Sequence, residues 1–179
     1  MSNDFYIVSK LNGNVLDVAG NNSGAGTQII SYPINSPASG NQMWERVPTG
    51  PKGPAGGQGE YYITSKLNGY VLDVRGNNDG AATPIINYPT NEPASSNQIW
   101  TIVESDQEGW FYIISQLNGY VLDIEGADQK PGAHIINYPQ NKPTSDNQLW
   151  QFVKKEDAGS HKKKSFAPGK KTAFATKQP

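Results

Sequence analysis

Short apolar segments separated by turn residues recur along most of the chain. In residues 61–103 the apolar and β-branched residues come in four short runs, and Gly, Pro and Asn stand between them. Asn68-Gly69, between the first two runs, is a strong hairpin signal because both residues tolerate positive φ. No segment keeps a helical period over ten residues, so the pattern predicts β-strands and an all-β fold. The expected strands are residues 62–65, 71–74, 84–88 and 97–103.

The same pattern occurs three times. Residues 5–47, 61–103 and 111–153 align without gaps, and 21 of their 43 columns are identical in all three copies. Internal repetition of this kind is the signature of a repeat architecture. Four strands in each copy predict about twelve strands in the chain.

Three copies restrict the way in which the chain can close. Propellers typically use about four to eight blades, and an open stack would need distinct capping repeats, which the sequence lacks. A closed threefold arrangement, in which each copy contributes a third of one core, meets both objections. We therefore expect a β-trefoil, with the Pro- and Gly-rich residues 48–59 as an exposed connection between the first two copies.

Charge separates the repeats from the end of the chain, although the whole chain has a formal net charge of −1. Residues 1–153 carry 7 Lys and Arg against 14 Asp and Glu, whereas residues 154–179 carry 8 Lys against 2 acids. The acidic body argues against nucleic acid binding by the folded part. We expect a domain at 1–153 and a basic, disordered tail at 154–179, for which a nuclear address or contact with an anionic surface is an alternative.

The composition indicates the cellular compartment and excludes some kinds of chemical site. The chain has no Cys, which excludes disulfides, a thiolate nucleophile and a Cys-based zinc site. It has no run near the ~18 apolar residues of a membrane-spanning helix. A signal peptide would have a basic start followed by an apolar segment, and the sequence shows neither feature. The expectation is a cytoplasmic protein without a transmembrane segment.

A Gln-x-Trp motif, preceded each time by Asn, lies near the end of every copy. A Leu-Asp pair lies upstream of each motif and in phase with it. Together these features resemble the ricin-B-type lectin family, over residues 5–153. Without Cys or a signal, the chain is more similar to the fungal members than to the secreted plant toxin subunits. The motifs are Asn41-Gln42-Met43-Trp44, Asn97-Gln98-Ile99-Trp100 and Asn147-Gln148-Leu149-Trp150.

The resemblance implies a β-trefoil fold, carbohydrate binding and one sugar site in each copy. In the family such a site uses an Asp, a residue on the third strand, an aromatic residue two positions later and the Asn before Gln-x-Trp, while the Gln supports the Asp. No copy has lost a member of this set, so multivalent binding is expected. The expected carbohydrate-binding residues are Asp17, Ile30, Tyr32, Asn41 and Gln42 in the first copy, Asp73, Ile86, Tyr88, Asn97 and Gln98 in the second, and Asp123, Ile136, Tyr138, Asn147 and Gln148 in the third.

These residue types suit a hexose on chemical grounds alone. A carboxylate accepts charge-assisted hydrogen bonds from adjacent hydroxyls, and an Asn amide both donates and accepts. A Tyr ring offers a flat apolar platform to the C–H face of the sugar. Because the axial 4-hydroxyl of galactose exposes such a face well, we expect the ligands to be terminal galactose or N-acetylgalactosamine of glycoproteins or glycolipids.

Repetition can also reflect the symmetry of the fold. We interpret Trp44, Trp100 and Trp150 as core residues, and the glutamines of the motifs as structural supports. Each Asp could likewise be only a turn stabiliser, since a buried carboxylate needs its oxygens satisfied. The complete set of Asp, Tyr and Asn in all three copies favours contact with a ligand.

Catalysis finds little support in the sequence. A glycosidase needs two carboxylates in distinct environments, and each copy repeats only one acid. His134 and His161 are the only histidines, and neither lies in a triad or metal motif, so no enzymatic activity, metal or cofactor is expected. His134 replaces Gln28 and Pro84 at the edge of the third site, as a solvated residue that could tune it.

The sequence favours a lectin over two alternatives. A β-trefoil protease inhibitor would act through one distinctive loop, and residues 48–59 are the only candidate. A carbohydrate-binding module detached from an enzyme would require a truncated chain, because nothing after residue 153 is large enough to be catalytic. The sequence is compatible with an oligomer and does not set the oligomeric state.

Overall fold

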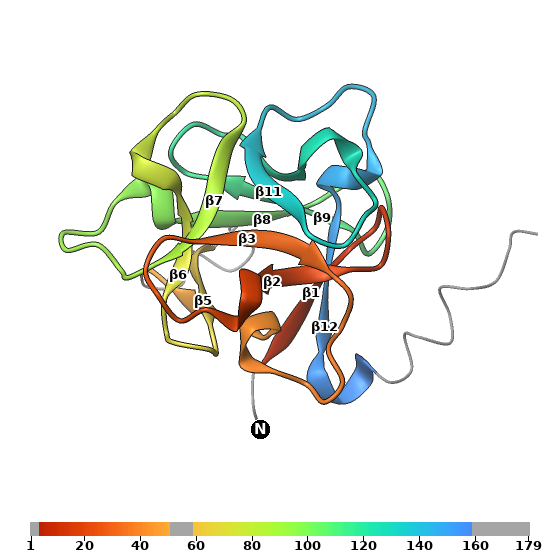
Figure 1. The fold of residues 1–179 in the computed structure, drawn as a ribbon. Helices are drawn as coiled ribbons and strands as arrows, with labels where there is room; N and C mark the ends of the chain where they lie inside the picture. The colour runs from red at the N-terminus through yellow and green to blue at the C-terminus, as the bar shows by residue number, and fades with distance from the viewer. Residues whose placement is uncertain (1–3, 51–58, 159–179) are drawn as a thin grey trace, which may run out of the picture.

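Twelve β-strands form one antiparallel sheet system in residues 4–50 and 59–158, the part of the chain that this computed structural model describes (Figure 1). The first repeat holds β1 (Phe5–Ser9), β2 (Val15–Val18), β3 (Thr27–Tyr32) and β4 (Trp44–Pro48). The second holds β5 (Glu60–Ser65), β6 (Val71–Val74), β7 (Thr83–Tyr88) and β8 (Trp100–Glu104). The third holds β9 (Phe111–Ser115), β10 (Val121–Ile124), β11 (Ala133–Tyr138) and β12 (Trp150–Lys154).

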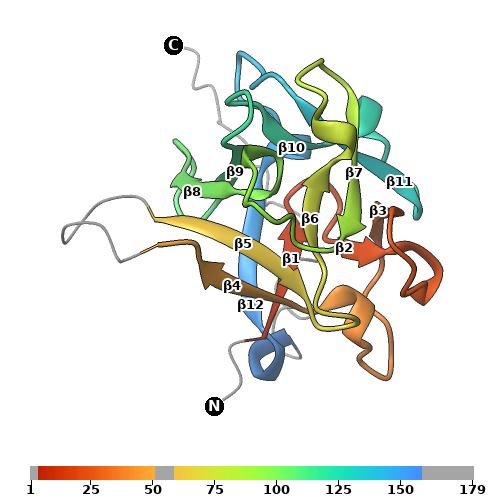
Figure 2. The same ribbon diagram turned by 90° about the vertical axis from the view of Figure 1, so that its left-hand side faces the viewer.

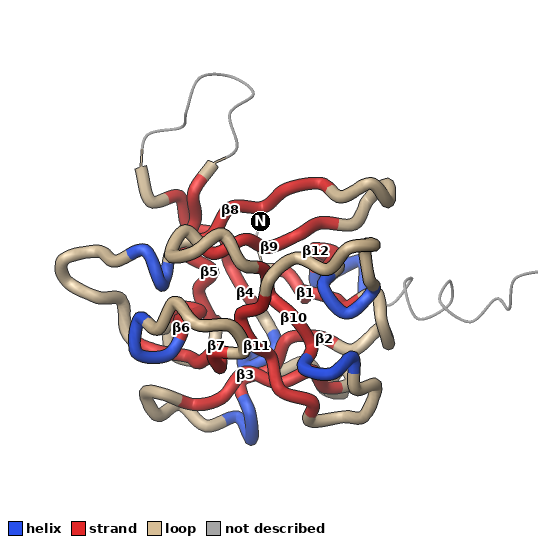
Figure 3. Tube along the Cα trace, turned by 90° about the horizontal axis from the view of Figure 1, so that it is seen from above, coloured by secondary structure: helices blue, strands red, loops and turns tan. Residues whose placement is uncertain are grey.

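Short turns of 3-10 helix connect the strands. Those between strands are η1 (Ala19–Asn21), η2 (Gly40–Gln42), η3 (Arg75–Asn77), η4 (Ser96–Gln98), η5 (Glu125–Ala127) and η6 (Asp146–Gln148), and η7 (Lys155–Asp157) follows the last strand. In Figure 3 several of them lie at the edge of the view, outside the strands. In the described ranges, no helix has the length and apolar character needed to cross a membrane.

Six of the strands close into a barrel. β1 pairs with β4 and β12, β5 pairs with β4 and β8, and β9 pairs with β8 and β12. Each strand therefore has a partner on both sides, and the barrel has no free edge to be protected.

Three hairpins cap this barrel, one from each repeat. Within a repeat the second and third strands pair over four residues, as β2–β3, β6–β7 and β10–β11. The strands β3, β7 and β11 also pair with one another in a triangle. In Figure 2 these three strands lie on the opposite side from the barrel strands β4 and β5. A barrel with a threefold cap is the β-trefoil architecture expected from three copies.

One side chain lies where the three hairpins meet. Gln28 Nε2 donates to the carbonyl oxygens of Ile29, Ile85 and Ile135, at 2.9, 3.0 and 3.2 Å. These isoleucines are equivalent in the three repeats, so a single amide group joins all three lobes at the centre of the cap.

The tryptophans of the three motifs lie in the core, as predicted. Each is at most 1% exposed, and aliphatic side chains from equivalent positions of all three repeats surround it. A buried indole N–H needs an acceptor. Trp44, Trp100 and Trp150 donate at 3.1 Å to the backbone oxygens of Leu16, Leu72 and Leu122, respectively.

The fourth strand of each repeat is shorter than the sequence predicts. In the second repeat the expected strand 97–103 was wrong at its start, because η4 takes Asn97 and Gln98 and β8 begins at Trp100. The side-chain amides of Asn97 and Gln98 both donate to β6, at 3.3 and 2.7 Å. Successive residues of an extended strand point to opposite faces, so a strand could not make both bonds.

The folded part extends past the expected boundary after residue 153. β12 continues through Lys154, whose Cα partner is Phe5, and η7 follows it. Residues 51–58 of the expected connection and 159–179 of the expected tail lie outside the described residues.

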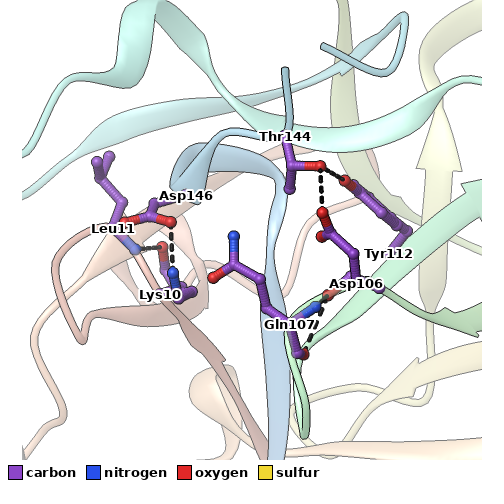
Figure 4. Close-up of polar contacts among 9 residues, drawn as sticks. Lys10, Leu11, Asp106, Gln107, Tyr112, Thr144 and Asp146 are labelled. Atoms are coloured by element: carbon purple, nitrogen blue, oxygen red, sulfur yellow. Dashed lines mark hydrogen bonds and ion pairs between the residues drawn. The ribbon is translucent and has the colours of Figure 1, made fainter. Parts of the chain in front are cut away.

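Polar contacts join the third repeat to its surroundings (Figure 4). Lys10, after β1, forms an ion pair with Asp146 of η6 at 2.6 Å. Thr144 Oγ1 accepts from the Tyr112 hydroxyl at 3.2 Å and donates to Asp106 Oδ2 at 3.4 Å. The Asp146 side chain is 48% exposed, and exposed ion pairs contribute only about 0–1 kcal/mol. This ion pair therefore adds little to the strand pairings and the apolar core that join the repeats.

We expect Trp100→Ala to lower the free energy of unfolding by about 3–5 kcal/mol, because it leaves a large cavity and the Leu72 carbonyl without its donor. Urea unfolding measures the change. Trp110→Ala is the matched control, since Trp110 is only partly buried and lies outside the main core. Equal losses for the two variants would contradict the central role of the motif tryptophan.

Candidate functional site

One buried Asp lies in the second strand of each repeat. Asp17 in β2, Asp73 in β6 and Asp123 in β10 are each 3% exposed. A carboxylate buried to this extent is costly unless hydrogen bonds satisfy it. The motif glutamine supplies one such bond in every copy. Gln42, Gln98 and Gln148 donate through Nε2 to Oδ2 of Asp17, Asp73 and Asp123, each at 2.7 Å.

The glutamines are fully engaged by the protein. In the second copy Gln98 Nε2 also donates to the Pro89 carbonyl at 2.8 Å, and its Oε1 accepts from the Asn91 backbone N–H at 2.8 Å. The other two copies repeat these contacts at 2.8 and 2.9 Å. Because the glutamine side chains are 0% exposed, they position the aspartates and can act on a ligand only through them.

The Asn before each Gln packs against the same strand. Asn41 Nδ2 donates to Asp17 Oδ1 at 3.0 Å. Asn97 and Asn147 donate to a backbone oxygen of β6 and β10, each at 3.3 Å. Ser39 Oγ donates to Asn41 Oδ1 at 2.6 Å, and the second copy repeats that bond. These contacts fix the orientation of the amides, which are 2–6% exposed and offer a ligand only their edge.

The third strand of each hairpin supplies an apolar wall. Asp73 is the direct partner of Ile86 across β6 and β7, so both side chains and Tyr88 lie on one face of the hairpin. Ile86 is 5% exposed, whereas Tyr88 is 41% exposed. An exposed ring therefore stands beside a buried carboxylate. The equivalent partners are Asp17 with Ile30 and Asp123 with Ile136, followed by Tyr32 and Tyr138.

In the second copy these side chains line a pocket of about 340 Å³. Four of the five residues expected there form its wall, namely Asp73, Ile86, Tyr88 and Asn97. The fifth, Gln98, is buried and supports Asp73 through the bond to Oδ2. Four further residues complete the lining, which sequence reasoning missed: Arg75, Gly76, Asn77 and Asn91.

Two of the missed residues carried a signal in the repeats. Asn91 and Gly76 stand in columns that are identical in all three copies. Gly76 has a φ of +66°, a conformation that residues with a Cβ rarely adopt, and it turns the chain from β6 along the pocket. Arg75 differs in every copy, so repetition could not have revealed it. The counterparts of Asn91 and Gly76 are Asn35 and Gly20 in the first copy and Asn141 and Gly126 in the third.

Burial raises the pKa of all three aspartates above the ordinary value of 3.8, while hydrogen bonds from the Gln and Asn amides oppose the shift. The pKa of Asp123 rises to about 6, because the desolvation is joined by repulsion from Glu125. His134 lies at this edge of the third site, with Nδ1 3.8 Å from Glu125 Oε2, and its side chain is exposed. The third carboxyl is thus electrostatically distinct from the other two.

The arrangement suits a polyhydroxylated ligand with one apolar face. The carboxylate and amide edges can exchange hydrogen bonds with hydroxyls, and the exposed ring can pack against C–H groups. Throughout residues 4–50 and 59–158, no group of three or more His, Cys, Asp or Glu side chains is placed to hold a metal ion.

The sequence matches the model of a known family. A family model described as a ricin-type beta-trefoil lectin domain-like domain matches residues 1–88, 40–138 and 96–164. The chain belongs to this family. The resemblance expected from the Gln-x-Trp repeats is confirmed, and membership of a lectin family supports carbohydrate binding. No curated protein sequence matches the chain significantly.

Solved structures of ricin-type lectins and of a designed protein are similar to the chain. The designed threefold-symmetric protein ThreeFoil is 26% identical with a TM-score of 0.75, over 86% of this chain and 99% of that one. The C-half of an earthworm R-type lectin, in complex with GalNAc, is 27% identical with a TM-score of 0.58, over 85% and 98%. The Rhizoctonia solani agglutinin is 22% identical with a TM-score of 0.68, over 86% and 95%, and shares the fold.

The raised pKa of Asp123 predicts a pH dependence of stability. Because the folded chain holds this proton more tightly than the unfolded chain, the free energy of unfolding should fall as the pH rises from about 4 to about 6. Asp123→Asn should reduce that slope, as measured by urea unfolding at a series of pH values.

The contribution of Glu125 is tested separately. Glu125→Gln removes the neighbouring charge and should lower the pKa of Asp123, as followed by NMR of the Asp123 carboxyl carbon. An unchanged midpoint would show that burial alone sets this pKa.

Proposed function

We propose that this chain is a non-enzymatic, multivalent lectin whose three pockets each bind a terminal galactose or N-acetylgalactosamine. The binding domain is the one expected at residues 1–153, and the ligands are glycans of glycoproteins or glycolipids. The observation that carries the proposal is the second pocket, in which the 41%-exposed ring of Tyr88 stands beside the buried carboxylate of Asp73.

The size and chemistry of that pocket favour one sugar residue. Its 340 Å³ lies near the lower end of the range of about 300–1,000 Å³ for small-molecule sites. Asp73 and Asn97 can pair with adjacent hydroxyls, while Tyr88 takes the C–H face that the axial 4-hydroxyl of galactose leaves open. The GalNAc complex of the earthworm lectin half, which is 27% identical, is in keeping with this sugar class.

Calorimetric titration with lactose and with mannose tests the ligand class. We expect heat with lactose and none with mannose, because mannose has an equatorial 4-hydroxyl and lacks the continuous C–H face. Asp73→Asn keeps the shape of the side chain while removing its charge, and should weaken binding at the second pocket. Absence of lactose binding at tens of millimolar, or equal binding of mannose, would refute the galactose assignment.

The presence of the same Asp, Tyr and Asn set in each of the three repeats supports multivalency as the mechanism. A single shallow pocket should bind a sugar in roughly the millimolar range, about −4 kcal/mol. The pockets belong to different hairpins of the cap, so one small glycan cannot bridge them, whereas a dense glycan surface can engage several. Linked binding of this kind raises avidity by about 10²–10⁴ without new contacts.

Removal of the aspartates one at a time tests the valency. Asp17→Ala, Asp73→Ala and Asp123→Ala should each reduce the lactose stoichiometry by one site, and any two together should reduce retention on a galactosylated surface by far more than a third. Circular dichroism checks that the variants are folded. If one substitution abolished all binding and the other two had no effect, a single pocket would carry the activity.

A further inference from the structure

One position at the rim of the site carries a different charge in each of the three copies. The residue that follows the second strand and opens the 3-10 turn is Ala19 in η1, Arg75 in η3 and Glu125 in η5. The backbone before it is nearly the same in the three copies, with φ and ψ of −76° and 108°, −75° and 109°, and −81° and 112°. An identical turn therefore carries a neutral, a cationic or an anionic side chain at the same place.

Arg75 lines the second pocket together with Asp73 and Tyr88, and its side chain is exposed. Within the described residues, no ion pair or side-chain hydrogen bond engages its guanidinium. The nearby Asp73 carboxylate is bound by Gln98 instead. The guanidinium donors are thus available to a ligand held against Tyr88.

The third pocket has the opposite character. Glu125 opens η5 at the position that Arg75 has in η3, so it places a second carboxylate near Asp123. In residues 4–50 and 59–158, the only basic side chain within ion-pair distance of Glu125 is His134, whose Nδ1 lies 3.8 Å from Glu125 Oε2, and this contact is ionic only when the histidine is protonated. An anionic ligand would meet two carboxylates there, whereas at the first pocket Ala19 adds no charge.

We propose that Arg75 makes the second pocket selective for galactosides that carry an anionic substituent, a sulfate or a carboxylate, and that Glu125 excludes these from the third pocket. The inference rests on the proposed binding of galactosides. The planar guanidinium pairs with carboxylate and with sulfate-like oxyanions through two parallel hydrogen bonds, which gives both affinity and orientation. A single chain then joins acidic and neutral glycans on one scaffold.

The test isolates the second pocket in the Asp17→Ala/Asp123→Ala background and titrates it with lactose, 3′-sulfated lactose and 3′-sialyllactose. We expect the anionic probes to bind roughly tenfold tighter than lactose, the gain from one charge-assisted contact at a partly exposed site. The two anionic probes distinguish sulfate from carboxylate. The preference should shrink at 0.5 M salt, since the contact lies at the surface.

Substitutions at the rim position assign the preference to Arg75. Arg75→Ala, which copies the first pocket, should bring the affinity ratio of anionic to neutral probe to about one, and Arg75→Glu, which copies the third, should bring it below one. Lys130→Ala removes the same charge from an exposed loop of the third repeat and should preserve the ratio. Ala19→Arg in the otherwise unaltered chain should add a second anion-preferring site, which tests the rule without the double-alanine background.

The outcomes separate this inference from the proposed function. If lactose binds but the anionic probes bind no tighter, or if Arg75→Ala leaves their higher affinity unchanged, the assignment to Arg75 is wrong. The proposed lectin function is then unaffected. If no probe binds to the folded protein, the galactoside proposal fails and this inference fails with it.

Discussion

The three lobes depend on a carboxylate that must be satisfied inside the protein. Each Asp is 3% exposed, and the motif glutamine bonds it at 2.7 Å while being held itself by a backbone N–H and a proline carbonyl. The Leu before that Asp accepts the indole N–H of the motif tryptophan at 3.1 Å. The Gln-x-Trp motif therefore bonds two neighbouring residues of the second strand. Its Gln bonds the Asp at the pocket, and its Trp bonds the Leu carbonyl in the core. Loss of either bond leaves a buried polar group unpaired, which costs about 1–3 kcal/mol.

This double link explains why the sequence alone revealed so much of the fold. Columns that are identical in three copies mark the strands, the tryptophan core and the Asp, Tyr and Asn of the pocket. The predicted start of the fourth strand was wrong because tertiary hydrogen bonds override the local sequence pattern there. Asn97 and Gln98 precede an apolar run and look extended, but both side chains must reach β6, so the backbone forms a 3-10 turn instead. Arg75 was missed for the opposite reason, because a residue that changes between copies carries no repeat signal.

Symmetry of the backbone does not imply symmetry of the chemistry. At the centre of the cap three equivalent carbonyls converge, and one amide, that of Gln28, serves all of them. Pro84 and His134 hold the same position in the other copies without duplicating that role, because a proline side chain has no donor and the His134 side chain is exposed beside Glu125. The fold therefore needs no hydrogen bond from the side chains at positions 84 and 134, and His134 lies beside Glu125 at the third site.

At the pockets, too, the residues that hold the Asp differ from the residues that set the charge around it. Hydrogen bonds to each Asp come from residues that recur in all three copies, so the geometry of the carboxylate is common to them. The charge around it comes from the rim, where Ala19, Arg75 and Glu125 vary freely because the side chain at that position is not needed by the fold. At Asp123 burial raises the pKa to about 6, and repulsion from Glu125 adds to that shift only in this copy. Duplicated sites can therefore differ in charge while the bonds that hold the Asp and the Trp stay the same, but a like charge such as Glu125 lowers the free energy of unfolding once Asp123 ionises.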